Sequence, residues 1–319
     1  MILVTGATGF VGGHVVRALV DAGERVRALV RDAGSAEALD GVDCELASGD
    51  VTDTESIRAA LEGCTTVVHL VAILTGRPAD FERVMTQGTR GLLDAARAAG
   101  VSRFVQMSAL GTSEATKDTV PYYRAKWASE EAVRSSGLGH AILRPSFVFA
   151  PDGGALAQFA RIAKLAPVTP VIGKGTQRLQ PIWADDLARA VTLAVRRDDD
   201  LLVEIGGPDV VDWNAFWSQL KVAIGTRRPT VHLPFWFMRP QAAILERLPR
   251  PPVTRDQLRM LQLGDNVVSD GGASMAALGI GETLPLAEQL RIAVGRAAVG
   301  QQHDADQQDA DQQDADQRD

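Results

Sequence analysis

The sequence predicts an α/β fold in which helices cover both faces of a parallel sheet. Apolar runs rich in β-branched residues, such as ILVTG, RVRALV, TTVVHLVAI, RFVQMS and HAILRPSFVF, alternate with segments of helical pattern. Three glycines stand at the junction between the first run and the helical pattern that follows it. A chain of 319 residues is long enough to add a second, smaller lobe to such a sheet.

The glycine-rich junction reads TGATGFVG at 5–12. A glycine in a tight turn reaches positive φ without steric cost, one without a Cβ lets a ligand approach the backbone, and one in the helix packs close to the strand. Gly6, Gly9 and Gly12 can divide these roles between them. Free amides and the positive end of the helix dipole would then hold an anion, so the junction predicts a phosphate site. The alternative is that the glycines only shape the turn.

The helices of the first half carry recognisable start and stop signals. Apolar residues recur at helical spacing from Val11 onward, and Gly23 stands where the helix should end. The TDTE stretch at 52–55 has the pattern of a capping box and should begin a second helix. Further helices are expected from about 81 to 99 and from about 120 to 135.

The alternation loosens after residue 150, where prolines, glycines and aromatic residues become more frequent. We expect a nucleotide-binding domain over 1–150, with a return segment at about 179–206 that contains the helical pattern WADDLARAVTLAVR. A smaller substrate lobe would comprise 151–178 and 207–298. The DADQQ repeats of 299–319 offer no large apolar side chain that could offset the entropy of ordering, so a disordered acidic tail is expected there.

Composition excludes several classes of protein. Most of the net charge of -7 comes from the tail, which has seven Asp and one Arg from residue 301 onward, so the remainder is nearly neutral and gives no support to nucleic-acid binding. Cys44 and Cys64 are the only cysteines and form no cluster with histidine, which indicates neither a disulfide framework nor a metal site. No apolar stretch of transmembrane length and no basic leader is present, so we expect a cytoplasmic protein.

The segment PFWFMRPQAAILE at 234–246 is unusually apolar for the second half of the chain. It could line a substrate pocket, belong to the core or contact a membrane. Pocket lining or core packing is favoured, because the basic polar face of an interfacial helix is missing.

Three motifs together resemble the extended and atypical short-chain dehydrogenase/reductase families. They are TGATGFVG at 5–12, the YxxxK pattern of Tyr122 and Lys126, and LRPSFVF at 143–149, and the resemblance extends to about residue 295. In the second half, IGKGTQRLQPIWADDLARAV, EIGGPDVV and VTRDQLRMLQLGDNVV are similar to the branch that contains the NAD(P)H-binding accessory subunit of respiratory complex I and its bacterial relatives. The resemblance implies a doubly wound Rossmann-type sheet that binds a nicotinamide dinucleotide, with an epimerase/dehydratase-like second lobe.

The resemblance also implies which residues hold the cofactor. The motifs SGDVTD and HLVA stand at the ends of predicted strands, where open α/β sheets bind ligands. For Val71 and Ala72, packing in the core is an equal alternative. The implied residues are Gly6, Thr8, Gly9, Phe10, Val11 and Gly12 at the pyrophosphate, Asp50 and Val51 at the adenine ring, Leu70, Val71 and Ala72 along the cofactor, and Pro145 at the nicotinamide.

The end of the second strand indicates which nicotinamide cofactor binds. NAD-selective sites place an acidic residue there, whereas VRALVRD has Arg31 at this position and Asp32 one residue later. A guanidinium could clamp a 2′-phosphate through paired, charge-assisted hydrogen bonds. The sequence therefore favours NADP(H) over NAD(H), unless Arg31 is merely exposed on the loop.

Tyr122 and Lys126 are four residues apart in a helical pattern, so their side chains should project from one face. A phenol with an ordinary pKa of about 10 is a poor acid–base catalyst at neutral pH unless a nearby cation stabilises the phenolate. Lys126 would supply that cation and would also bind the nicotinamide ribose. The alternative is a chance Tyr/Lys pair on a solvated helix.

The sequence departs from the active members of these families at two places near the expected chemistry. Met85 stands where they have an asparagine, and Ala109 stands where they have a serine or threonine that stabilises the reacting oxygen. Ser108 or Thr112 could supply the missing hydroxyl. Two functions therefore remain open: an oxidoreductase acting on a carbonyl, alcohol or sugar-like substrate in the cleft between the lobes, or a non-catalytic NADP(H)-binding accessory or assembly subunit. The partner would be a second copy in a homodimer or a membrane complex.

Overall fold

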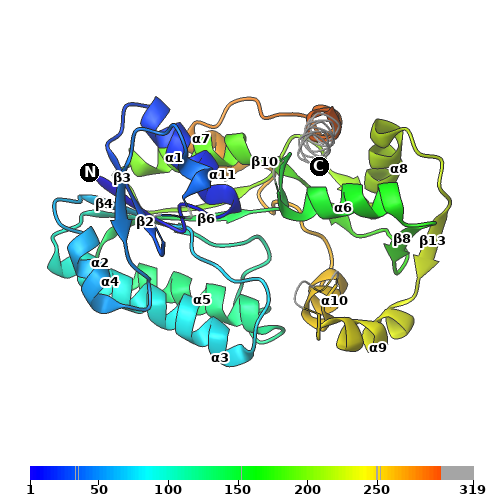
Figure 1. The fold of residues 1–319 in the computed structure, drawn as a ribbon, viewed down its shortest axis with the longest axis horizontal. Coiled ribbons are helices and arrows are strands. Elements are labelled where there is room, and N and C mark those ends of the chain that lie inside the picture. The colour runs from blue at the N-terminus through cyan, green and yellow to red at the C-terminus, as the bar shows by residue number, and fades with distance from the viewer. Residues whose placement is uncertain (33, 35, 152, 249–250, 252, 296–319) are drawn as a thin grey trace, which may run out of the picture.

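The computed structural model describes residues 1–32, 34, 36–151, 153–248, 251 and 253–295. Its main sheet has seven strands in the order β11-β6-β5-β4-β1-β2-β3, all of them parallel (Figure 1). This confirms the predicted α/β class. The strands are β1 (Ile2–Thr5), β2 (Val26–Val30), β3 (Glu45–Ser48), β4 (Thr66–His69), β5 (Arg103–Met107), β6 (Gly139–Pro145) and β11 (Leu201–Ile205).

The sheet is covered on both faces. On one face lie α1 (Phe10–Asp21), α7 (Ala184–Val195) and α11 (Ala273–Leu278); α1 packs against α7, and α11 contacts both α7 and β11 (Figure 1). The other face carries α2 (Thr54–Ala60), α4 (Gly88–Ala98) and α5 (Pro121–Arg134), and α4 packs against both of its neighbours. A 3-10 turn, η2 (Glu37–Leu39), follows β2.

Alternate residues of the central strands contribute to two separate cores. Leu3 of β1 faces the cluster that includes Ile57 of α2 and Leu92 of α4, whereas Val4 faces the cluster that includes Val16 of α1. β1, β4 and β5 are buried at every position, which explains why their apolar residues do not alternate with exposed polar ones. Each fully buried Val or Leu in such a core stabilises the fold by about 1.5–3 kcal/mol.

The helix boundaries largely match the sequence signals. Helix α1 ends before Gly23, which has a φ of 82° as expected of a C-terminal glycine. The second helix begins one residue later than the capping-box pattern predicts: Asp53 is its N-cap and accepts a hydrogen bond from the Glu55 amide at 3.2 Å. Thr52 instead donates its amide and hydroxyl to Asp50.

The helix expected from about 81 to 99 is irregular. It starts as α3 (Pro78–Phe81), passes through a π-helical segment η3 (Glu82–Gln87), and continues as α4. The Met85 carbonyl oxygen in η3 accepts hydrogen bonds from the hydroxyls of Thr89 at 2.5 Å and Ser129 at 3.3 Å. These side-chain bonds replace part of the regular helical ladder, a feature that apolar periodicity does not reveal.

A second, smaller part of the molecule surrounds an aromatic core. Phe159 of α6 lies 5.4 Å from the rings of Trp213, Phe216 and Trp217 of α8, mostly edge to face. Residues 286–295 form a further helical segment beside this core. The elements are β7 (Val148–Ala150), α6 (Gly154–Leu165), β8 (Thr169–Ile172), β9 (Arg178–Leu179), β10 (Ile182–Trp183), β12 (Val211–Asp212), α8 (Trp213–Ile224), β13 (Thr230–Leu233), α9 (Phe235–Leu245) and α10 (Arg255–Gln262).

Between two excursions into this second part, the chain returns to the main sheet as α7 and β11. Leu201 to Ile205 of β11 pair with Ala141 to Pro145 of β6. Among the helices of the described residues, none combines the length and the hydropathy needed to cross a membrane. The acidic tail predicted over 299–319 lies outside the described residues.

Candidate active site

The candidate site lies at the edge of the main sheet where the parallel strands end. Gly6, Leu70 and Ser108 directly follow the last residues of β1, β4 and β5, and Pro145 is the last residue of β6, so all four positions lie at one edge. The strand order reverses between β1 and β4, and ligands of open α/β sheets bind outside the strand ends at such a switch point.

Two of the three glycines are required by the backbone geometry of the first turn. Gly6 has a φ of 74°, and a Cβ at this position would lie 3.1 Å from the backbone nitrogen of Val71. A Cβ on Gly12 would lie 2.1 Å from the carbonyl oxygen of Gly6 and 2.5 Å from that of Ala7. Gly6 therefore makes the tight turn, and Gly12 allows the close packing of helix on strand.

The N-terminus of α1 is prepared for an anion. Gly9 is the N-cap, has an extended backbone (φ −75°, ψ 172°), and provides no side-chain cap. No acidic residue stands in the first turn, and first-turn amides have no acceptor within their own helix. The uncapped helix end and the glycine turn beside it fit the diphosphate of a dinucleotide.

The aromatic ring of Phe10 connects this turn to the second part of the molecule. A Cβ on Gly153 would lie 2.8 Å from the Phe10 ring, and one on Gly154, which has a φ of 70°, would lie 2.6 Å from it. The close approach holds the beginning of α6 against the glycine turn. Only glycines at both positions leave room for the ring.

Charged residues meet at the ends of β2 and β3, where the adenosine half is expected. Hydrogen bonds from Thr52 and the charges of Arg31 and Arg83 lower the pKa of Asp50, against the opposing effect of its partial burial. Arg83 comes from the π-helical segment and was not recognised in the sequence. Asp32 turns its carboxylate back to a backbone amide two residues further on. Two guanidinium groups therefore act on the same region beside Asp50.

The remaining residues implied for the cofactor lie in the turn or at the same sheet edge. The Leu70 amide donates to the Thr5 carbonyl at 3.1 Å, so the chain after β4 stays close to the end of β1. Val71 packs against the core shared with α2 and α4, in line with the alternative of core packing. Thr8 and Ala72 are exposed, Phe10, Val11, Leu70 and Val71 are partly buried, and Val51 and Pro145 are buried.

Tyr122 and Lys126 meet on one face of α5. The Lys126 amine lies 5.8 Å from the centre of the Tyr122 ring and donates a hydrogen bond to the Met107 carbonyl oxygen at 2.7 Å. Burial lowers the pKa of Lys126 to about 8, although the nearby Glu130 carboxylate opposes this shift. Burial also raises the pKa of Tyr122 above its ordinary value. The amine therefore lies near the tyrosine ring, and the raised pKa keeps Tyr122 in its phenol form at neutral pH.

A fully buried carboxylate, Glu130, lies one turn beyond Lys126. Its oxygens accept hydrogen bonds from Arg144 at 2.9 and 2.6 Å, from Arg134 at 2.7 Å and from the Ser108 hydroxyl at 2.5 Å. The Ser108 proton is therefore directed to Glu130. Sequence reasoning missed this network, although the four-residue spacing from Lys126 to Glu130 to Arg134 is a detectable signal.

Met85 provides apolar surface near Tyr122, and Thr112 provides a hydroxyl without a hydrogen-bond partner in the described residues. Met85 is buried with Phe81 and Ala125, and the Tyr122 ring packs partly against this cluster. The Thr112 hydroxyl is buried and has no hydrogen-bond partner within the described residues. The Tyr122 ring therefore lies beside an apolar surface that includes Met85.

His69 takes no part in proton transfer as placed. Its ring nitrogens lie 2.6 Å from the Thr5 hydroxyl and 3.0 Å from the Thr89 hydroxyl, and burial together with Lys126 lowers its pKa to about 3. The imidazole is therefore neutral at physiological pH and serves to connect β1, β4 and α4.

Comparisons with known proteins agree with this geometry. An NAD(P)H-binding family model matches residues 6–163. Ceramide reductase of Caulobacter vibrioides is 30% identical over 237 residues, which are 73% of this chain and 74% of that protein. The fold and the glycine turn thus define an NAD(P)H-binding protein of the Rossmann class. The chain belongs to the extended short-chain dehydrogenase/reductase superfamily.

The similarity to other known proteins extends into the second half of the chain. NADH dehydrogenase [ubiquinone] 1 alpha subcomplex subunit 9 of Arabidopsis thaliana is 29% identical over 288 residues, covering 84% of this chain and 70% of that protein. The crystal structure of gox2253 is 25% identical with a TM-score of 0.76, over 92% of this chain and 97% of that chain. UDP-glucose 4-epimerase of Thermotoga maritima shares the fold at 22% identity, with a TM-score of 0.72 over 93% and 99% of the two chains.

Proposed function

We propose that the protein is an NADP(H)-dependent oxidoreductase that interconverts a carbonyl and an alcohol on a small molecule bound between the two lobes. One observation carries the proposal: the buried Lys126 amine lies beside the Tyr122 phenol at the sheet edge where an NAD(P)H-binding fold presents its cofactor. Burying an ammonium group carries a desolvation cost. A lysine with only a structural role would not require this cost, so its burial here supports a chemical role for Lys126.

In the direction of reduction, NADPH held at the glycine turn would supply the hydride that the carbonyl carbon receives. Tyr122 gives its hydroxyl proton to the carbonyl oxygen, so that hydride and proton together yield the alcohol. Lys126 stabilises the phenolate left on Tyr122, which later takes up a proton from solvent. The ammonium form of Lys126 is needed for this role, and it prevails below the lowered pKa of about 8.

The chain's own residues would hold the cofactor from both ends. The amides that follow Gly9 would bind the diphosphate, and Lys126 would bind the ribose next to the nicotinamide. Pro145 at the end of β6 would contact the nicotinamide ring. Ser108 acts as a positioning residue, because its hydroxyl donates to Glu130 near Lys126. The Thr112 hydroxyl, which has no partner within the described residues, would donate a hydrogen bond to the reacting oxygen.

NADP(H) is proposed over NAD(H) because of the charges near Asp50. Arg31 and Arg83 both act on this carboxylate from the solvent side, so their guanidinium groups are available to a 2′-phosphate. An NAD site would present a carboxylate to the ribose at the end of β2, whereas Asp32 points back to its own loop.

Names of relatives widen the range of carbonyl substrates to test. A ceramide reductase and, over 47% of this chain, sterol demethylase protein B of Methylococcus capsulatus are among the similar proteins. Both names refer to lipids, so an apolar long-chain ketone belongs in a substrate screen.

The two free cysteines, Cys44 and Cys64, support a reducing compartment such as the cytoplasm.

A non-catalytic function is the second candidate, and Met85 and Ala109 favour it. Neither side chain can donate a hydrogen bond to a reacting oxygen, and such a donor often contributes a few kcal/mol. The similarity to a subunit of NADH dehydrogenase supports an accessory role in which bound NADP(H) stabilises a protein that acts through a partner in a membrane complex. A homodimer is the other assembly to test.

The deciding experiment compares cofactor retention with turnover. The purified protein is analysed for bound NADPH, and NADPH oxidation is then followed with aldehydes, ketones and quinones for the natural protein and for Tyr122→Phe. Turnover that disappears in Tyr122→Phe while NADPH still binds supports the oxidoreductase. Tight NADPH retention without turnover supports the accessory protein, and turnover unchanged in Tyr122→Phe excludes Tyr122 as the acid.

A further inference from the structure

The helix α9 and the turn that follows it expose an apolar row. Trp236, Pro240, Ile244 and Leu248 follow one another at four-residue spacing, and the exposed fractions are 75% for Trp236, 64% for Ile244 and 50% for Leu248. Phe237, adjacent to this row, is 41% exposed. We call these five residues the α9 face. Large apolar side chains gathered in this way are uncommon on a surface that only meets water.

The packing of α9 on the protein uses a different side of the helix. Met238 and Ala242 are buried, and they form a cluster with Leu258 of α10. The helix is therefore apolar on two opposite sides, of which only one is covered by the described chain. Figure 1 shows α9 at the periphery of the second part, beside α10 and away from the main sheet. The sequence prediction that this segment packs in the core or lines a pocket holds for the inner side alone.

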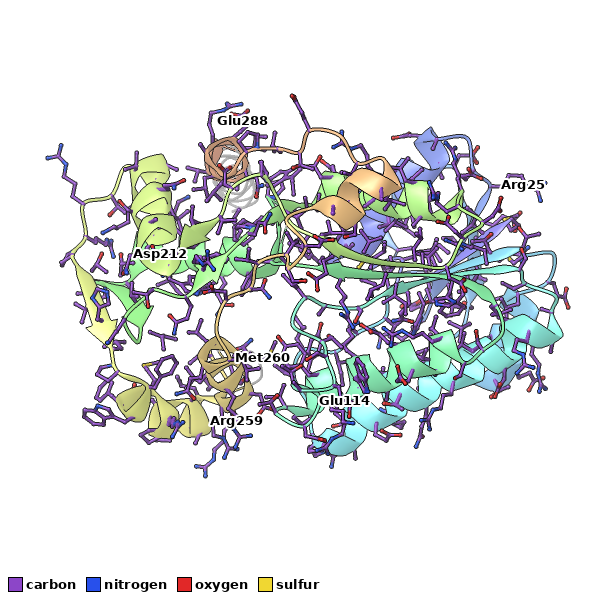
Figure 2. All side chains as sticks on the ribbon, turned by 180° about the vertical axis from the view of Figure 1, so that it is seen from behind. Arg25, Glu114, Asp212, Arg259, Met260 and Glu288 are labelled. Atoms are coloured by element: carbon purple, nitrogen blue, oxygen red, sulfur yellow. The ribbon has the colours of Figure 1, made fainter. Side chains whose placement is uncertain are left out.

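The surroundings of the α9 face are positively charged in an otherwise acidic protein. Residues 221–263 contain eight Lys and Arg against two Asp and Glu, whereas the whole chain has a net charge of -7. Both acidic residues are already paired, Glu246 with Arg255 at 2.8 Å and Asp256 with Arg259 at 3.3 Å. Figure 2 shows side chains of α9 directed outward, with Arg259 labelled nearby on α10.

Two exposed arginines of α9 and its end accompany the apolar row. Within the described residues neither Arg239 nor Arg247 takes part in an ion pair, and Arg239 donates only to the Gln262 side chain at 3.1 Å. Their long side chains can lie along an apolar surface while the guanidinium stays in a polar layer. This supplies the basic component whose absence in the sequence pattern argued against an interfacial helix.

We propose that the α9 face docks the protein on the surface of a bilayer that contains anionic phospholipids. Tryptophan prefers the boundary between acyl chains and headgroups, and arginine beside it attracts the anionic headgroups. With 11 residues, α9 is too short to span a bilayer, so it lies in the plane of the interface. The local positive charge favours this occupant over an acidic second copy of the chain. The proposal does not depend on whether Tyr122 catalyses a reaction.

The test is sedimentation of the full protein with phosphatidylcholine vesicles, with and without added phosphatidylglycerol. We expect binding only when phosphatidylglycerol is present, and weaker binding at high salt. The double change Ile244→Ser and Leu248→Ser should weaken binding at least about tenfold, because two large apolar contacts with the bilayer are lost. Val222→Ser on α8 is the matched control, since Val222 is 79% exposed but lies outside the α9 face.

Two further measurements keep the proposal open to refutation. Arg239→Glu with Arg247→Glu should remove the preference for phosphatidylglycerol, and thermal unfolding and NADPH binding should stay unchanged in all variants because the side chains are exposed. The proposal is wrong if the protein stays in the supernatant with anionic vesicles at low salt. It is equally wrong if size-exclusion chromatography shows an oligomer that Ile244→Ser dissociates while no variant changes vesicle binding, because a second copy then covers the face.

Discussion

The Lys126 amine lies 5.8 Å from the centre of the Tyr122 ring and is held there by the Met107 carbonyl oxygen at 2.7 Å. This bond comes from the end of β5, so the position of the ammonium is fixed by the main sheet rather than by α5 alone. A phenol whose neighbouring charge is placed by the sheet can change its protonation without a rearrangement of the fold.

Replacement of the phenol tests that relationship directly. Tyr122→Phe removes one hydroxyl from a partly exposed ring, so the fold should be unaffected, while turnover should fall at least about 100-fold through loss of the general acid. Steady-state NADPH oxidation gives the turnover, and fluorescence titration gives the dissociation constant of NADPH, which should stay within about twofold. Loss of NADPH binding in this variant would instead assign the Tyr122 hydroxyl to cofactor binding.

The pH dependence of turnover should report Lys126. Its pKa is lowered to about 8 by burial, so the ammonium loses its proton as the pH rises through 8 and turnover should fall there. Lys126→Arg keeps its charge at all accessible pH values and should move this limb upward, although the larger side chain lowers the maximal rate. A limb that stays near pH 8 in Lys126→Arg would show that another group titrates.

The same shift has a consequence for stability. Because the folded state lowers the pKa of Lys126, the charged amine disfavours folding below about pH 8, and this effect disappears as the pH approaches the ordinary lysine pKa. Lys126→Met should therefore unfold at a temperature no lower than that of the natural protein at pH 7, despite having no activity. Thermal unfolding followed by circular dichroism measures this, and a strongly lowered melting temperature would contradict it.

Glu130→Gln should lower the free energy of unfolding far more than the same change at the adjacent Glu131. The substitution leaves the Arg144 guanidinium, whose side chain is 10% exposed, without its carboxylate, and breaking a buried pair costs about 3–5 kcal/mol. Glu131→Gln is the control, since Glu131 is exposed and its pair with Arg134 contributes about 0–1 kcal/mol. Denaturant unfolding compares the two variants. In Glu130→Gln the alkaline limb of the activity should also move below pH 8, because Glu130 raises the pKa of Lys126.

Arg31 and Arg83 should determine the choice between cofactors. Arg31→Ala and Arg83→Ala are each expected to weaken NADPH binding about tenfold or more and to leave NADH binding unchanged, because only NADPH carries the 2′-phosphate. Arg97→Ala, an exposed arginine near the end of α4, should change neither affinity. Equal NADPH and NADH affinities in the natural protein and in all three variants would exclude the proposed 2′-phosphate contact.

The glycine turn offers a prediction that needs no substrate. Gly12→Ala places a methyl group 2.1 Å from the Gly6 carbonyl oxygen, so the first turn must shift, at a cost of about 3 kcal/mol or more. Gly91→Ala is the matched change in α4, where the added methyl meets no atom within 4 Å and should stabilise the helix by up to about 1 kcal/mol. Thermal unfolding with and without NADPH distinguishes the two. NADPH should raise the melting temperature of Gly91→Ala but not that of Gly12→Ala.

The fold was predictable because its causes are local in the sequence. A parallel sheet buried on both faces requires apolar strands such as TTVVHL, and the spacing of Gly6 and Gly12 follows from a turn and a close helix contact that the structure contains. The features that were missed depend on residues distant in sequence. Glu130 gains its importance from Arg144 of β6 and from Ser108, which directly follows β5.

Two other features were missed because a pattern was interpreted too narrowly. Apolar periodicity predicts a helix near Met85 but not its π-helical segment, which carries Arg83, a charge that lowers the pKa of Asp50. The apolar segment 234–246 was expected to line a pocket or pack in the core, and only the exposed fractions show that one of its two apolar sides is uncovered in the described residues. Burial is a property of the assembled chain, so the sequence alone does not assign it.

The return of the chain to the main sheet has a practical consequence. In chain order, β7 to β10 lie between β6 and its sheet neighbour β11. Residues 286–295 pack against the second core although they follow α11, which covers the main sheet. The chain therefore passes between the two lobes several times. No single cut separates them, so a chimaera that exchanges the second lobe for that of a relative must splice the chain at multiple junctions. Rotation of one lobe on the other would likewise change the backbone angles of all of these connections together.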